Sequence, residues 1–277
     1  MRLPIRLTSL LIAALLGCAS AAIQAQAREE GRLLIASEVL EDLRGGRDER
    51  IPDWLLERAY GIAVIPDLTK VAFFAGGRHG RGVLVVRDSK GEFTNPVFVT
   101  MTGGSFGFQW GVQATDIVLV FTTPKGIEGI NGGKVTLGAD ASVAAGPVGR
   151  TASAATDSNF KAEVYSYSRS RGVFAGIALD GTVIRIDDDA NDAFYQKAGV
   201  STADILSGAV TTNDEAARRF MAAVATSTGV QRSASAAGAA GTAPVPTPSP
   251  ATSPATPATP AQSFPLPDPQ PGQEPPR

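Results

Sequence analysis

Apolar residues early in the chain recur at the spacing of an α-helix. Between residues 30 and 44 they lie three or four positions apart, and charged residues occupy many of the positions between them. This pattern predicts an amphipathic helix that ends at Gly45 and Gly46. A short second helix is expected after Pro52, because proline is accepted where a helix begins and apolar residues follow it at once. The apolar positions of the first helix are Leu33, Ala36, Leu40 and Leu43.

After residue 61 the pattern changes to short β-rich runs divided by glycine, which is typical of strands. Asp180 and Gly181, between the last two runs, predict a hairpin turn. Short helices are expected at 191–198, 201–207 and 214–226. Together these elements predict an α+β fold, in which short helices flank a curled or barrel-like, mostly antiparallel sheet. The expected strands are 62–65, 71–75, 83–87, 97–101, 117–122, 135–137, 162–168, 173–179 and 182–186.

The first 27 residues have the composition of an export leader. Two arginines precede an apolar run over residues 10–16, and small residues then form a signal-peptidase site that ends at Ala27. An alternative stays open, because residues 15–17 and Cys18 resemble a lipobox, in which the cysteine is lipidated and begins the mature chain. We therefore expect an exported protein that is periplasmic, or membrane-anchored as a lipoprotein if Cys18 is acylated.

Composition also sets the domain boundaries. Residues 28–231 are rich enough in apolar side chains for one folded domain, and about 200 residues suffice for a single core. Residues 232–277 consist largely of Ala, Pro, Thr and Ser, which predicts a disordered, extended tail. The expected order is a leader (1–27, or one ending before Cys18), a domain (28–231) and a tail (232–277).

Charge and residue counts argue against several classes of protein. The formal charge of −2 becomes −4 if Arg2 and Arg6 leave with the leader, which argues against a nucleic-acid partner. Cys18 is the one cysteine and His79 the one histidine, so neither a disulfide framework nor a zinc or copper site is expected. The sequence predicts no metal and no cofactor.

Residues 103–107 fit the G-x-S-x-G motif of serine hydrolases. That motif needs a turn from strand to helix around Ser105 and a histidine further along the chain. Here a strand-like or glycine-rich segment follows, and His79 lies upstream. We therefore expect no enzyme activity.

Residues 187–192 imitate the start of a calcium-binding EF-hand loop. Asp192 stands where that loop needs glycine, and Ala198 stands where it needs glutamate. A helix N-terminus explains the acidic residues better, with Asp189 or Asn191 as its cap.

The glycine-rich segment 76–82 allows two interpretations. Its glycines could let backbone amides approach an anion, while Arg78 and Arg81 bind phosphate oxygens. It lacks the Gly-Lys-Ser/Thr ending of a nucleotide-binding loop, and a strand follows it where such a loop would open a helix. In the second interpretation it is a tightly curved strand with solvated arginines. The residues alone leave both open.

Several long strings of this chain resemble the SYLF domain, and together they cover about residues 30–210. The resemblance implies a non-enzymatic domain that binds phospholipids, with phosphoinositide and actin-related roles in eukaryotic relatives. Bacterial relatives are commonly exported, and an actin role is not expected to carry over to a bacterial periplasm. The strings are AYGIAVIP (59–66), GGRHGRGVLVVR (76–87), PVFVTMTGGS (96–105), QATDIVLVF (113–121), TLGADASVAAGPVGR (136–150) and AEVYSYSRSRGVFAG (162–176).

These observations lead us to expect a phospholipid-binding module of the cell envelope that binds anionic headgroups through the glycine- and arginine-rich segment. Each basic side chain near an anionic surface contributes about 1 kcal/mol, so the cations help only if they share a face. The helix over residues 30–44 mixes acidic with basic residues and is expected to pack on the sheet. The alternative is a structural or protein-interaction module whose partners are envelope proteins. Candidate lipid-binding residues are Arg78, Arg81, Lys125, Lys134, Arg169 and Arg171, and Cys18 is the candidate lipidation site.

Overall fold

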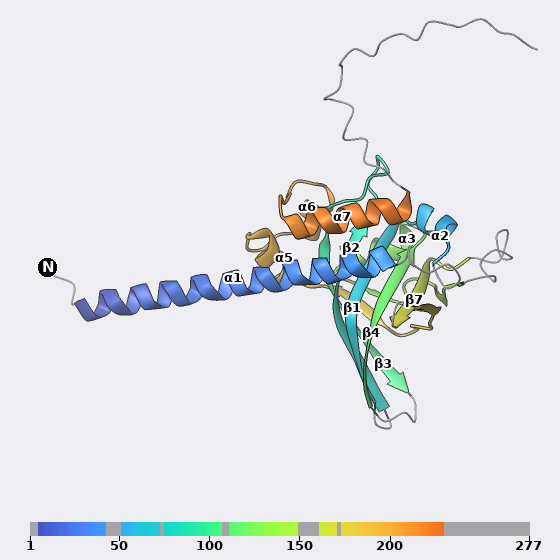
Figure 1. Ribbon diagram of the computed structural model, residues 1–277, viewed down its shortest axis with the longest axis horizontal. Helices are drawn as coiled ribbons and strands as arrows, with labels where there is room; N and C mark the ends of the chain where they lie inside the picture. The colour runs from blue at the N-terminus through green and yellow to red at the C-terminus, as the bar shows by residue number, and fades with distance from the viewer. Residues whose placement is uncertain are drawn as a thin grey trace, which may run out of the picture. The chain divides into compact units, whose positions relative to one another are not determined.

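The structure is a computed structural model of the chain, and it describes residues 5–42, 51–72, 75–106, 111–148, 161–170 and 173–229. Within these residues nine strands form one curled sheet that is covered by helices (Figure 1). The predicted α+β class is therefore confirmed. The strands are β1 (Gly61–Ala72), β2 (Ala75–Val86), β3 (Val97–Phe106), β4 (Gly111–Phe121), β5 (Lys134–Thr136), β6 (Val143–Ala145), β7 (Val164–Ser170), β8 (Val173–Gly176) and β9 (Val183–Ile186).

The strand order is β5-β9-β3-β2-β1-β4-β7-β6, and β8 pairs with β7. The pairs are antiparallel except for β6 with β7, which is parallel. The link from β8 to β9 joins the two ends of the sheet. At one end of this link, Ile177 N–H donates to the carbonyl of Ser166 in β7. At the other end, the carbonyl of Thr182 accepts from N–H of Leu137, which follows β5. These bonds hold the sheet in a curl.

The helices of the described residues lie on both faces of the sheet. Helices α1 and α7 run side by side across one face (Figure 1), and α2 and α5 join them there. Helices α3 and α6 bury Ile127, Ile130 and Ile205 on the other face. The bounds are α1 (Ile5–Asp42), α2 (Asp53–Glu57), α3 (Lys125–Asn131), α5 (Asp188–Tyr195), α6 (Thr202–Leu206) and α7 (Glu215–Thr228).

Both faces of the central strands are therefore buried. Along β1, Ile62 and Val64 pack under α1 and α7, while Ala63 and Ile65 pack on the opposite side. The same alternation runs through β2 and β4, as the two-residue period of a strand requires. A sheet covered on both faces explains why these runs are almost continuously apolar in sequence.

Helix α1 contains the predicted amphipathic helix, but it begins much earlier, within the predicted leader. Its buried residues include the predicted Leu33, Ala36 and Leu40, and they face the sheet as expected. Leu43 lies outside the described residues. None of the described helices is both long enough and apolar enough to cross a membrane.

Two sequence predictions need correction, and one helix was not predicted. Asp180 and Gly181 do form a turn, but the strands they join do not pair, because β8 pairs with β7 whereas β9 pairs with β3 and β5. Gly181 N–H of this turn donates to the Leu137 carbonyl, and Leu137 N–H donates to the Thr182 carbonyl. The cap of α5 is Asp187, whose Oδ1 accepts from Ala190 N–H at 3.3 Å, and not Asp189 or Asn191. Helix α3 was missed.

Candidate anion-binding site

A β-bulge in β1 decides which of its side chains face which side of the sheet. The pairing of β1 with β4 shifts between Ile65 and Leu68, where β1 contains one residue more than β4. Asp67 lies in this bulge with φ at 50°, and its N–H donates to Oδ1 of Asp116 at 3.0 Å. Because side chains alternate along a strand, the extra residue brings Leu68 and Lys70 to the face that Ile65 occupies.

Two glycines of β2 make room for the bulged strand. A Cβ at Gly82 would lie 2.4 Å from the carbonyl oxygen of Val64, and one at Gly80 would lie 2.6 Å from Cγ2 of Ile65. The whole of segment 76–82 is part of β2. The strand conformation of the second interpretation is therefore confirmed, and these glycines serve close strand packing.

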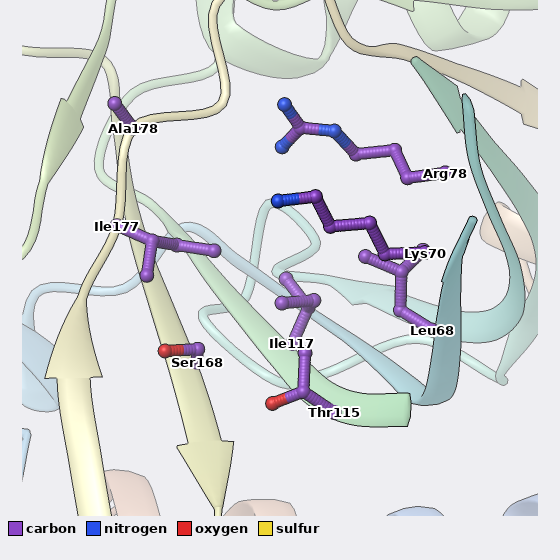
Figure 2. A pocket seen from close by; sticks show the side chains of 8 residues that line it. All are labelled: Leu68, Lys70, Arg78, Thr115, Ile117, Ser168, Ile177 and Ala178. Atoms are coloured by element: carbon purple, nitrogen blue, oxygen red, sulfur yellow. The ribbon is translucent and has the colours of Figure 1, made fainter. Parts of the chain in front are cut away.

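The bulge places Lys70 directly opposite Arg78 in the pairing of β1 with β2. We call these residues the Lys70–Arg78 pair. Like charges at directly opposed positions of neighbouring strands destabilise a sheet. Both side chains extend toward the same open space, as Figure 2 shows. Arg78 was predicted from the sequence, whereas Lys70 was not, because without the bulge Lys70 would face the other side of the sheet.

Only part of the hydrogen-bonding capacity of the Arg78 guanidinium is used. Its Nη2 donates to the Gly104 carbonyl at 3.0 Å, while its covered Nε has no hydrogen-bond partner within the described part of the chain. Burial lowers the pKa of Arg78, and no carboxylate of the described residues opposes that shift. Gly103 stands opposite Arg78, and a Cβ there would meet Cγ of Arg78 at 3.3 Å and Oγ1 of Thr182 at 2.9 Å.

A cavity of about 320 Å³ lies in front of the Lys70–Arg78 pair. Its lining comes from β1, β2, β4, β7 and the segment after β8 (Figure 2). The described lining combines two cations, two hydroxyl groups and an apolar wall, and it includes no carboxylate. The lining residues are Leu68, Lys70, Arg78, Thr115, Ile117, Ser168, Ile177 and Ala178.

The sequence around the cavity carries a signal that was overlooked. Residues 68–87 and 93–115 contain no Asp or Glu, although the chain has 27 acidic residues. These two segments contain β2, β3 and the Lys70 end of β1, so these neighbouring strands lack acidic side chains altogether over those residues. An anion entering the cavity would therefore meet cations without competing carboxylates from these strands.

The chain is similar in sequence to known proteins. The family model described as "Ysc84: Las17-binding protein actin regulator" matches residues 102–227. The chain is 38% identical over 165 residues to LAS seventeen-binding protein 3 of Saccharomyces cerevisiae, which covers 58% of this chain and 36% of the relative. It is 32% identical over 166 residues to human SH3 domain-containing YSC84-like protein 1, covering 60% and 48%. The predicted resemblance to the SYLF family is thereby confirmed over residues 102–227. The chain spans about a third to a half of the length of these curated relatives.

Other predicted lipid-binding cations of the SYLF domain are neutralised by carboxylates. Lys125 Nζ lies 2.9 Å from Oε1 of Glu163, and this contact raises the pKa of Lys125 and lowers that of Glu163. Arg169 Nη1 lies 2.7 Å from Oδ2 of Asp116, and its Nη2 pairs with Asp42 at the end of α1. These two cations thus join segments that are distant in sequence.

The remaining candidates do not gather at the cavity. Lys134 is exposed on β5, at the far end of the sheet from β7. Arg171 lies outside the described residues, and Cys18 falls in α1 at a position whose side chain is not described. Of the six predicted cations, Arg78 is the one found among the described lining residues.

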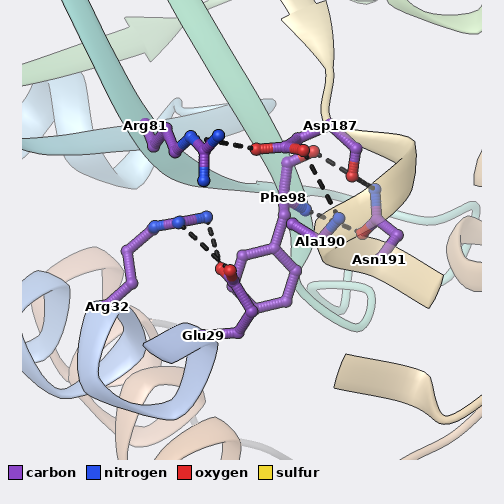
Figure 3. A network of polar contacts seen from close by, with 7 residues as sticks. All are labelled: Glu29, Arg32, Arg81, Phe98, Asp187, Ala190 and Asn191. Carbon is purple, nitrogen blue, oxygen red and sulfur yellow. Dashed lines mark hydrogen bonds and ion pairs between the residues drawn. The ribbon is translucent and has the colours of Figure 1, made fainter. Parts of the chain in front are cut away.

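Arg81 lies on the opposite face of β2 from Arg78 and belongs to a network under α1 (Figure 3). Its Nε is 3.7 Å from Oδ2 of Asp187. Glu29 and Arg32 of α1 form an ion pair beside it, with side chains 6% and 12% exposed. Burial raises the pKa of Glu29 and lowers that of Arg32, and each partner opposes the other's shift. We call Glu29, Arg32, Arg81 and Asp187 the α1 clamp.

Asn191 supports this network from α5 (Figure 3). Its side chain is buried, with Oδ1 accepting from Phe98 N–H at 2.9 Å and Nδ2 donating to the Phe98 carbonyl at 3.2 Å. The Phe98 ring in turn lies 5.5 Å from the Arg32 guanidinium. The acids of 187–192 therefore build a helix start, and no cluster of three or more His, Cys, Asp or Glu that could hold a metal occurs in the residues described.

The hydrolase motif is part of a strand. Ser105 pairs with Gly76 near the end of β3, and the next described residue, Gly111, begins β4. Positions 76 and 105 are directly paired and so share a face of the sheet. His79 lies three residues after Gly76 in β2, and because side chains alternate along a strand it faces the other side. The names of the relatives above describe Las17-binding and SH3-containing proteins, not enzymes.

Proposed function

We propose that this SYLF domain is a non-enzymatic module of the cell envelope that binds anionic phospholipids at the Lys70–Arg78 pair. The observation that carries the proposal is two cations directly opposite each other, facing a cavity whose described lining includes no carboxylate. Such an arrangement costs stability when it is empty. A phosphate oxygen between the two side chains would remove the repulsion, because both are strong donors to phosphate.

The envelope location belongs to the same proposal. It is supported by the leader-like composition of residues 1–27, with an apolar run and a signal-peptidase site. A peripheral module of this kind needs only a cationic site that meets the headgroups, since Lys and Arg near an anionic surface each contribute about 1 kcal/mol.

A second candidate is a protein-interaction module. It is favoured by the relatives named for binding Las17 and by the family description as an actin regulator. For this chain the partner would be another envelope protein, and the sheet surface would bind it without lipid.

Vesicle co-sedimentation separates the two. The full chain is mixed with vesicles of phosphatidylcholine alone, or of phosphatidylcholine and phosphatidylglycerol in equal parts, at low and moderate salt. Any binding through the apolar leader should be equal for both kinds of vesicle. The readout is therefore the difference in bound protein between anionic and neutral vesicles. The variant is Lys70→Ala/Arg78→Ala. The control Lys90→Ala/Lys197→Ala removes the same charge from two exposed positions.

We expect stronger binding to the anionic vesicles, weakened by salt because screening shortens the range of the attraction. The variant Lys70→Ala/Arg78→Ala should lose about 2 kcal/mol of binding free energy, or roughly 30-fold in affinity, because it removes two cations near the membrane surface. The control should keep most of its binding. Equal binding of the parent to both vesicles, or equal losses in variant and control, would contradict the proposal and leave the protein-interaction module as the better account.

A further inference from the structure

The cavity has a second polar side, formed by two hydroxyl groups whose hydrogens are already used. Thr115 Oγ1 donates to the Arg169 carbonyl at 2.8 Å, and Ser168 Oγ donates to the Ala175 carbonyl at 3.4 Å. A hydroxyl has one hydrogen to donate and two lone pairs to accept with. Toward a ligand in the cavity the Thr115 oxygen therefore acts as an acceptor, and the Ser168 oxygen, whose contact with Ala175 is long, can accept as well.

Donors and acceptors line the cavity from successive strands of the sheet. The four strands that carry them are neighbours in the order β2-β1-β4-β7. Arg78 and Lys70 supply the donors from β2 and β1, and the acceptors Thr115 and Ser168 follow on β4 and β7 (Figure 2). Between them the floor is apolar, because Leu68 lies opposite Thr115 in the sheet and Ile117 opposite Ser168.

A ligand that satisfies both sides must carry an anionic oxygen at one end and hydroxyl donors at the other. An ammonium headgroup fits poorly, since it would be held close to two cations. The volume of about 320 Å³ is at the lower end of the range for small-molecule sites, so it has room for a headgroup and not for acyl chains.

We propose that the cavity recognises the headgroup of a polyol phosphodiester lipid such as phosphatidylglycerol. The phosphodiester oxygens bind the Lys70–Arg78 pair, and the free hydroxyls of the glycerol donate to Thr115 and Ser168. The acyl chains stay in the bilayer. This inference rests on the proposed function and names the class of lipid that the same site selects.

The test compares two lipids that differ in the hydroxyl groups and not in charge. The full chain is titrated with vesicles of phosphatidylcholine containing equal amounts of either phosphatidylglycerol or phosphatidylethanol, whose phosphodiester has the same charge and no headgroup hydroxyl. Thr115→Val removes the acceptor, and Thr115→Ser retains it. The matched control is Thr69→Val, since Thr69 is exposed on the opposite face of β1 beside Lys70.

We expect the parent to prefer phosphatidylglycerol by about tenfold, the effect of one to two net hydrogen bonds. Thr115→Val should lose most of this preference, while Thr115→Ser and Thr69→Val should keep it. Equal binding to both anionic lipids, or a preference that survives Thr115→Val, would overturn the inference and leave the proposed function standing. Failure of the parent to distinguish either anionic vesicle from neutral vesicles would overturn the proposed function itself.

Discussion

Arg78 and Arg81 lie three residues apart in β2, and they face opposite sides of the same sheet. Arg81 faces α1 and approaches Asp187, with Glu29 and Arg32 beside it, so the α1 clamp contains two charges of each sign. Arg78 faces the cavity and stands opposite Lys70. The two arginines look equivalent in sequence, and the charges around them show that one serves the fold while the other is available to a ligand.

The comparison also separates two kinds of energetics. In the α1 clamp, removing one charge leaves its partner covered and unpaired, which is costly. In the Lys70–Arg78 pair, removing one charge relieves repulsion. A local arrangement that works against stability, in an otherwise consistent fold, is the kind of feature expected at a functional site.

The largest effect on stability should come from disturbing the packing of β2 against the bulge in β1. Gly82→Ala would place a Cβ 2.4 Å from the Val64 carbonyl oxygen, so the strands must separate. We expect a loss of about 3 kcal/mol in the free energy of unfolding, typical of overpacking against backbone. Urea unfolding measures it. Gly77→Ala is the control, because the nearest atom to its Cβ would be 4.0 Å away, and a similar loss there would argue against the packing explanation.

A smaller loss is expected in the α1 clamp. Arg32→Met leaves the carboxylate of Glu29 covered without its ion-pair partner, at a cost of about 2 kcal/mol near neutral pH. Thermal or urea unfolding of parent and variant gives this difference. No measurable change would mean that the clamp adds nothing to the attachment of α1.

This loss should depend on pH with a definite sign. Burial raises the pKa of Glu29 above its ordinary value of 4.5, so the native state holds a proton more readily than the unfolded chain. Stability from this group is present in acid and is lost as pH rises through the native pKa. Without Arg32, which lowers the pKa of Glu29, the total loss should be larger, so parent and variant should converge below about pH 4.5. As a control, the difference in free energy of unfolding between Glu29→Gln/Arg32→Met and Glu29→Gln alone should not vary with pH, because neither variant has the titrating carboxyl of Glu29.

Much of the fold could be predicted from apolar periodicity. The buried face of α1, the helices α5 to α7 and the central strands follow directly from spacing, because burial on a helix or strand repeats with a fixed period. The glycine-rich ends of β2 and β3 were predicted too short, since glycine lacks the side chain on which strand patterns depend. Here the shape of the neighbouring strand requires Gly80 and Gly82, and no local pattern encodes that.

The candidate site was only half predictable. Arg78 could be singled out by its glycine neighbours, although they serve strand packing. Lys70 was missed because a single extra residue in β1 decides its face. The ion pairs of Arg169 could not be predicted, since its carboxylate partners Asp42 and Asp116 lie 127 and 53 residues away in sequence. Pairing over such distances is set by topology.

The most direct test of the central claim is one substitution with two readouts, Lys70→Glu in the full chain. It turns the like-charged pair into an oppositely charged one, so the account predicts a gain of about 0.5 kcal/mol in the free energy of unfolding. The same variant should lose its preference for phosphatidylglycerol vesicles over phosphatidylcholine vesicles. A variant that is less stable than the parent, or that still prefers the anionic vesicles, would contradict the account.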